Sequence, residues 1–148
     1  MKDILCILIV LGSITSRAQS EYSKYIAPDS SQHRFYVRHK DGGDEKIHYL
    51  GVVRKQNGDT SYFVFAVFLR VQAAIVMHGH STVIFLNKKY KEVESYDVNL
   101  PENLPFRLKG HYLYFKYQDE VANKKKTFKF QIQGKLPEIL CYSPTECT

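Results

Sequence analysis

The sequence of 148 residues contains no tryptophan, two methionines, three cysteines and five prolines. Apart from one stretch at its N-terminus, it has no long uninterrupted apolar run, no low-complexity tract and no detectable repeat. It also lacks a Gly/Ser-rich or proline-rich linker of the kind that separates domains. We therefore expect one domain of roughly 130 residues, which is long enough to bury its own hydrophobic core.

Motifs for covalent catalysis are missing as well. The chain has no G-x-S-x-G elbow. Glu92, Glu94 and Asp97 share one region, but acids on the outer face of a strand are commonly surface groups without a catalytic role. The sequence thus predicts a protein that is not an enzyme, with no catalytic residue and no cofactor.

The one apolar stretch lies near the N-terminus and has the features of a secretory signal peptide. Lys2 precedes a short apolar core, and Ser16 and Ala18 are small residues at the −3 and −1 positions of a cut before Gln19. The core is too short to span the roughly 30 Å of hydrocarbon in a bilayer. We expect residues 1–18 to be removed, the mature chain to have no stable membrane span, and the protein to be exported to the periplasm or secreted.

Removal of residues 1–18 leaves two of the three cysteines, Cys141 and Cys147. Ser143 and Pro144 are turn-forming residues between them, and exported proteins form disulfides readily. We predict a disulfide between Cys141 and Cys147, in a C-terminal tail over residues 137–148 that follows a β domain over residues 19–136.

Short runs rich in Val, Ile, Phe and Tyr alternate with turn signals at about ten-residue spacing, which is typical of antiparallel sheets. The predicted strands are 34–39, 46–54, 61–70, 71–77, 82–87, 92–100, 111–117 and 127–133. Residues 61–70 are apolar on both faces and predict a central strand covered on each side. Asn57-Gly58 is a strong hairpin signal, whereas Pro101 and Pro105 place residues 100–106 in a connection.

Tyr22, Tyr25 and Ile26 have helical spacing after Ser20, which can cap a short N-terminal helical turn packed against an open end of the sheet. The predicted fold is all-β: a single antiparallel domain of about eight strands in mostly up-and-down order. Both a sandwich and a small barrel agree with this pattern.

The segment VMHGHSTVIF, residues 76–85, has three interpretations. In the first, His78 and His80 lie on the same face of a strand and bind a metal together with ligands from other strands. In the second, Gly79 allows a hairpin turn between two strands of similar length, and the histidines are solvated at its tip. In the third, the histidines lie in a strand and have no ligand role. The second is favoured, because one strand over residues 71–87 would be unusually long.

Tyr112 and Tyr114 alternate with Leu113, Phe115 and Tyr117, so aromatic rings are expected on both faces of this strand. Tyr112 and Tyr114 can be ordinary surface groups of a strand. Alternatively they form a platform for a sugar ring or a peptide, because tyrosine combines flat apolar area with a polar rim. They are the candidate ligand-binding residues.

Basic residues outnumber acidic ones, 21 to 15, and the net charge remains about +5 without residues 1–18. Lys124, Lys125 and Lys126 are expected in a solvated hairpin connection, where they attract acidic glycans or lipid headgroups weakly and in a salt-dependent way. Export and the lack of a recognition motif argue against nucleic acid as a partner.

Together these observations predict an exported, non-enzymatic β domain that binds a protein, a glycan or another component of the cell envelope or extracellular space. One alternative is a barrel that carries a small apolar ligand, although the two apolar faces of residues 61–70 do not suit a barrel wall. The other alternative is a metal-binding protein that uses His78 and His80.

Overall fold

The computed structural model describes residues 19–26, 32–55, 59–73 and 76–148. The signal-peptide prediction for residues 1–18 and the predicted turn at Asn57-Gly58 therefore lie outside the described residues. No helix in the described part of the chain is long and apolar enough to cross a membrane.

The protein is all-β, as predicted, with eight antiparallel strands and two short 3₁₀ helices among the described residues. The strands are β1 His33–Arg38, β2 Asp44–Arg54, β3 Thr60–Ala73, β4 Val76–Leu86, β5 Glu92–Val98, β6 Arg107–Lys109, β7 Tyr112–Asp119 and β8 Lys124–Gln131. The helices are η1, Glu21–Tyr25, and η2, Pro101–Asn103.

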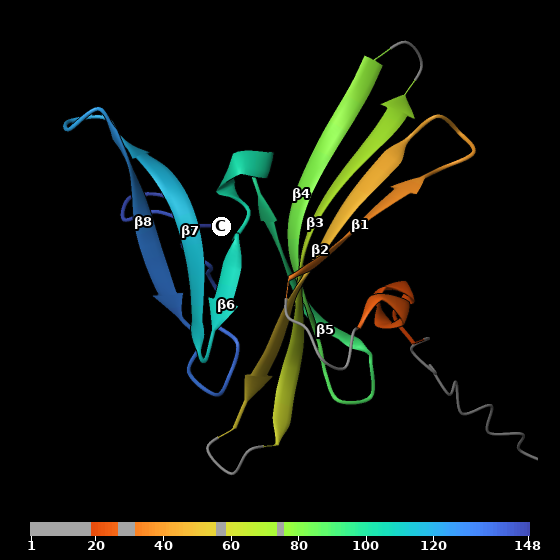
Figure 1. Ribbon diagram of the computed structural model, residues 1–148, viewed down its shortest axis with the longest axis horizontal. Coiled ribbons are helices and arrows are strands. Elements are labelled where there is room, and N and C mark those ends of the chain that lie inside the picture. Colours follow the sequence, from red (N-terminus) through yellow and green to blue (C-terminus); the bar gives the residue numbers. More distant parts are fainter. Residues whose placement is uncertain (1–18, 27–31, 56–58, 74–75) are drawn as a thin grey trace, which may run out of the picture.

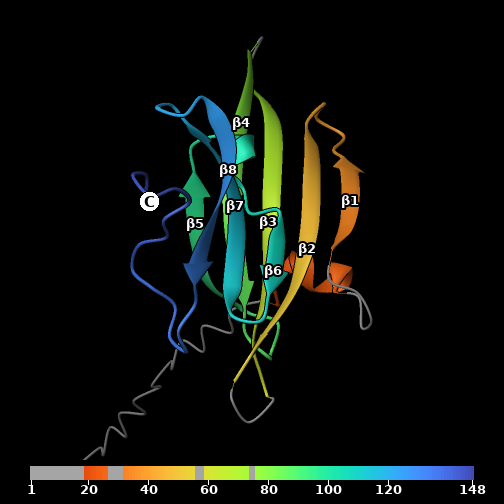
Figure 2. The same cartoon turned by 60° about the vertical axis from the view of Figure 1, so that its left-hand side comes forward.

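The strands form two sheets, each in simple sequence order. One sheet contains β1 to β5 and the other β6 to β8, and every neighbouring pair is antiparallel. The connection around η2 carries the chain from one sheet to the other, which agrees with the prediction that the prolines lie outside a strand. Figures 1 and 2 show the two sheets face to face, in a two-layer arrangement. The up-and-down order is confirmed.

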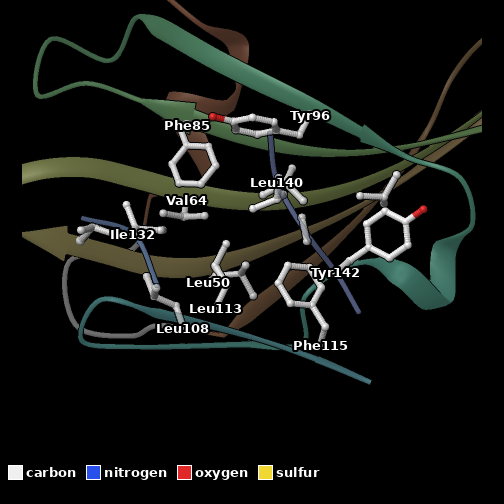
Figure 3. Close-up of a cluster of buried hydrophobic side chains, with 14 residues drawn as sticks. Leu50, Val64, Phe85, Tyr96, Leu108, Leu113, Phe115, Ile132, Leu140 and Tyr142 are labelled. Atoms are coloured by element: carbon white, nitrogen blue, oxygen red, sulfur yellow. The ribbon is translucent and has the colours of Figure 1, made fainter. Parts of the chain in front are cut away.

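The main core lies between the two sheets (Figure 3). Val64 and Phe85 on the five-stranded sheet face Leu113 and Phe115 on the three-stranded sheet, and all four are fully buried. Burial of such a side chain stabilises the folded state by about 1.5–3 kcal/mol. This filled interior holds the three-stranded sheet in place, and with it the residues that point away from the core.

A second apolar cluster covers the opposite face of the five-stranded sheet. Phe65 and Val67 alternate with Val64 and Ala66 along β3, so this strand is buried on both faces, as predicted for a central strand. The helix η1 lies on this outer face (Figure 1), and its Tyr22 ring packs against Phe65 at 6.0 Å between centroids. The predicted helical turn is present, but it covers a face of the sheet and not an open end.

Several predicted strand limits are wrong. Residues 61–70 and 71–77 are not separate strands, because β3 runs on from Thr60 to Ala73 and pairs with β4 from Phe63 to Ala73. The short strand β6 was missed. The number eight is nevertheless right, since one false division and one missed strand cancel. The false division concerns a strand end, where tertiary pairing decides the length.

The C-terminal residues are attached to the main core. Cys141 and Cys147 form the predicted disulfide, with an S–S distance of 2.06 Å. Leu140 and Tyr142 are almost fully buried in the cluster between the sheets (Figure 3). The Tyr96 hydroxyl of β5 donates a hydrogen bond to the Pro137 carbonyl. The tail therefore contributes side chains to the core as well as containing the disulfide.

Candidate binding face on the three-stranded sheet

The three-stranded sheet has one buried and one exposed face, because side chains alternate along its strands. Leu108, Leu113 and Phe115 point into the core. The residues that alternate with them, matched across strands by the pairing register, point away from the core. We call these ten positions the aromatic–cationic face: Arg107, Lys109, Tyr112, Tyr114, Lys116, Gln118, Lys125, Thr127, Lys129 and Gln131.

The aromatic–cationic face contains five cations and no carboxylate. All of its members are exposed except Tyr112 and Tyr114, which are partly buried. Asp119, at the end of β7, forms an ion pair with Lys126, whose position alternates with those of the face. The ten positions therefore include no acidic side chain that could neutralise the five cations of the face.

The predicted platform residues Tyr112 and Tyr114 both lie on this face, as the alternation along β7 requires. The Lys129 ammonium lies over the Tyr112 ring, 5.3 Å from its centroid. The Tyr114 ring contacts Phe106, immediately before β6, at 6.4 Å between centroids, and the Lys116 ammonium lies over Phe106 at 5.2 Å. Exposed cation–π contacts are worth about 0.5–1 kcal/mol, so a ligand can draw these lysines off the rings at small cost.

Sequence reasoning identified the tyrosines but missed most of the cations around them. Arg107 and Lys109 were missed because residues 100–106 were read as a connection and β6 after it was not recognised. Lys125 was placed in a hairpin loop, whereas β8 begins at Lys124, so the prediction of a loop for residues 124–126 is wrong. The alternation of cations with apolar residues in RLK, residues 107–109, was the available signal.

His78 and His80 do not lie at a hairpin tip. Both are within β4, where they pair with Val71 and Leu69 of β3, and the chain reverses between Ala73 and Val76. The prediction of a turn is wrong because β3 continues beyond the covered core and supplies β4 with backbone partners up to Val76. Both histidines are exposed, on the same face of the strand.

Among the described residues, no group of three or more His, Cys, Asp or Glu side chains lies close enough together to hold a metal ion. Two buried carboxylates have other partners. Asp44 accepts hydrogen bonds from Arg70 and Tyr36, and the bond from Arg70 holds the Asp44 pKa below its usual value. Glu45 accepts a hydrogen bond of 2.7 Å from the Tyr22 hydroxyl of η1.

His48 is the titratable group most perturbed by burial within the usual pH range. It lies on β2 beside the inter-sheet core, paired with Arg34 of β1 and Ala66 of β3. Burial, with a contribution from the Arg34 charge, lowers the His48 pKa to about 4. Its Nε2 atom is buried and has no hydrogen-bond partner in the described part of the chain. His48 is thus held neutral at pH 7, as a packing residue.

These features define a two-sheet, all-β protein with one aromatic and strongly basic sheet face. No protein-family model, no curated protein and no solved structure matches the chain.

Proposed function

We propose that this protein is an exported, non-enzymatic binding domain that recognises a polyanion through the aromatic–cationic face. The observation that supports this proposal is the composition of that face: five cations and two tyrosines among ten outward positions, with no carboxylate. An ordinary solvated sheet face mixes charges of both signs, which limits its attraction for any one ligand.

The sheet holds the cations at regular spacings. Arg107 and Lys109 are separated by one residue along β6, about 6.8 Å, and neighbouring strands lie about 4.8 Å apart. A ligand with closely spaced negative charges therefore meets several cations at once. Each exposed pair contributes about 1 kcal/mol at most in water, so useful affinity requires a polymer that engages many of them.

Tyr112 and Tyr114 add a flat apolar surface between the charges. Both are partly buried, so little side-chain entropy remains to be lost when a ligand packs on them. Such rings favour a partner with apolar faces over a simple inorganic anion.

Export is the second part of the proposal. It rests on the N-terminal sequence and is supported by the disulfide, since disulfides persist in oxidising compartments. The two alternatives from the sequence, a carrier of an apolar ligand and a metal-binding protein, gain no observation in their favour from the described residues.

A charge-reversal experiment tests the polyanion proposal. The variant Lys116→Glu/Lys129→Glu reverses two cations of the face, and Lys88→Glu/Lys89→Glu makes the same change in net charge in the exposed turn between β4 and β5. Binding to fluorescent dextran sulfate is measured by anisotropy for both variants and the parent protein.

We expect the face variant to lose roughly tenfold or more in affinity, because each reversed cation exchanges an attraction for a repulsion. The turn variant is expected to lose no more than about threefold, through the long-range effect of net charge. Equal losses in the two variants, or no binding by the parent protein, would contradict the proposal.

A further inference from the structure

A groove opens beside the aromatic–cationic face, between the ends of the two sheets. Its volume is about 550 Å³. The residues that line it are Val53, Arg54, Lys55 and Ser61 from the five-stranded sheet and its β2–β3 connection, and His111, Gln131, Ile132, Gln133 and Gly134 from the β7–β8 side. Val53 and Ile132 are each only 1% exposed, so a ligand in the groove contacts chiefly the polar and cationic side chains.

The groove is continuous with the aromatic–cationic face. Gln131 belongs to both: it pairs with Tyr112 across β7 and β8, and it lines the groove. The Gln133 amide lies next to it, with its Nε2 atom 3.4 Å from the Gln131 Oε1 atom. A ligand that lies over Tyr112 therefore reaches the groove by passing these two amides.

The groove has the same sign of charge as the face. Arg54 and Lys55 are cations on one wall, and none of its lining residues is Asp or Glu. Like the face, the groove also contains neutral hydrogen-bonding groups: the amides of Gln131 and Gln133 and the Ser61 hydroxyl.

We infer that the polyanion is an acidic polysaccharide, whose chain lies along the aromatic–cationic face and continues into the groove. This inference rests on the proposed function and adds the class of ligand. Sugar rings have apolar C–H faces that suit the partly exposed Tyr112 ring, and hydroxyls that suit the amides of Gln131 and Gln133, which both donate and accept. Their acidic substituents suit the cations.

Other polyanions match this combination less well. A bilayer surface cannot enter a groove between two sheets, and none of the ten outward positions of the face is an aliphatic residue that could insert between lipids. Double-stranded nucleic acid binds chiefly through its phosphates, which leaves the tyrosine rings of the face without an apolar partner.

The test uses a variant without any change in charge. Gln131→Ala/Gln133→Ala removes both amides from the groove, and Gln72→Ala removes an exposed amide of β3, outside both the face and the groove, as a control. Binding of the full chain is measured for polygalacturonate, an acidic polysaccharide, and for polyglutamate, an acidic polymer without sugar rings. Anionic vesicles of phosphatidylglycerol and double-stranded DNA are measured alongside, and thermal melting confirms that each variant is folded.

We expect the parent protein to bind polygalacturonate more tightly than the other three probes. The groove variant should lose about fivefold or more for polygalacturonate, from two lost hydrogen-bonding groups, and less than about twofold for polyglutamate. The Gln72→Ala variant should retain parental affinity for both. This pattern would support the acidic polysaccharide as the ligand.

Two results would overturn the inference while the proposed function stands. One is an equal effect of the groove variant on polygalacturonate and polyglutamate, with Lys116→Glu/Lys129→Glu still weakening both. The other is tighter binding of vesicles or DNA than of polygalacturonate. By contrast, a failure of that charge reversal to weaken any of the polymers would refute the proposed function itself.

Discussion

At the scale of single residues, burial distinguishes side chains that look alike in the sequence. Leu140 lies near the C-terminus, in a segment with no strand pattern, yet its side chain is fully buried between the sheets. Ile139, its neighbour, is 58% exposed. The two residues are similar in size and hydrophobicity and differ only in where the chain places them.

Replacing Leu140 with alanine should lower the free energy of unfolding by about 2–5 kcal/mol, through lost burial and the cavity left behind. Ile139→Ala, at the exposed neighbour, should change it by less than about 0.5 kcal/mol. Urea denaturation of both variants provides the measurement. Similar values for the two variants would show that the tail is not packed in the core.

The second prediction at this scale concerns His48. Because its folded pKa is about 4, below the ordinary value of the unfolded chain, the unfolded chain takes up a proton first as the pH falls. The stability contribution of His48 is therefore complete above about pH 6.5 and is lost as the pH falls from there toward about 4. Urea unfolding of the parent protein and of His48→Gln at a series of pH values in this range measures how much of the pH dependence of stability comes from His48.

The fall in stability between those pH values should be smaller in His48→Gln than in the parent protein, since glutamine does not titrate. His33→Gln is the matched control, because His33 is exposed at the edge strand β1. A pH profile of His48→Gln that parallels the parent would contradict the assignment of a buried, neutral imidazole.

At the scale of strands and turns, pairing between β3 and β4 explains the position of Gly79. A Cβ atom at Gly79 would lie 2.9 Å from the Cε2 atom of the Phe68 ring on β3. The ring thus covers the glycine across the two strands, in a part of the hairpin beyond the inter-sheet core.

The Gly79→Ala substitution should destabilise the protein by about 1 kcal/mol, because the Phe68 ring must move to make room. In a Phe68→Leu background the same substitution should cost nothing measurable, since the crowded ring atoms are gone. Thermal unfolding of the four proteins forms a double-mutant cycle. Additive effects would show that the two residues do not contact each other.

The C-terminal segment is the second element whose stability can be tested. The Cys141→Ser/Cys147→Ser variant should be less stable by about 2 kcal/mol, the value expected for closing so short a loop. The two sheets should remain folded, because their strands lie outside the closed loop. Backbone amides beyond Pro137 should show faster hydrogen exchange, because this segment contains the two backbone hydrogen bonds between Leu140 and Thr148.

Loss of all cooperative unfolding in that serine variant would show instead that the bridge supports the whole domain. Unchanged exchange in the tail would show that packing of Leu140 and Tyr142 alone holds it in place.

At the scale of the whole molecule, the hydrophobic core and the proposed binding face lie on different sides of the sheets. Their facing sides make the core, η1 covers one outer side, and the other outer side carries the aromatic–cationic face (Figure 1). Substitutions on that face should therefore alter binding without altering the fold.

Binding of dextran sulfate should weaken strongly with salt. Between about 0.1 M and 1 M salt the Debye length falls from about 10 Å to about 3 Å, and we expect roughly a tenfold or greater loss of affinity. Anisotropy titrations in sodium chloride measure this, with uncharged dextran as the control polymer. Affinity that is unchanged at 1 M salt would contradict an attraction based on exposed cations.

Local patterns in the sequence determined the fold class and part of the binding face. Period-two alternation in residues 111–117 and 127–133 placed Leu113 and Phe115 opposite Tyr112 and Tyr114, because successive side chains of a strand point to opposite sides. Residues 61–70, which are apolar on both faces, predicted a covered central strand. Cys141 and Cys147, the two cysteines outside residues 1–18, predicted a disulfide.

Only the tertiary structure decided where strands end and which charges gather. His78 and His80 are in a strand because β3 extends far enough to pair with them, and no local signal at Gly79 reveals that partner. Arg107 and Lys109 join Lys129 on one face only because β6 pairs with β7 and β7 with β8. Pairing register depends on the turns and on the apolar pattern of the partner strand as well as on the local pattern, so one segment read alone does not determine it.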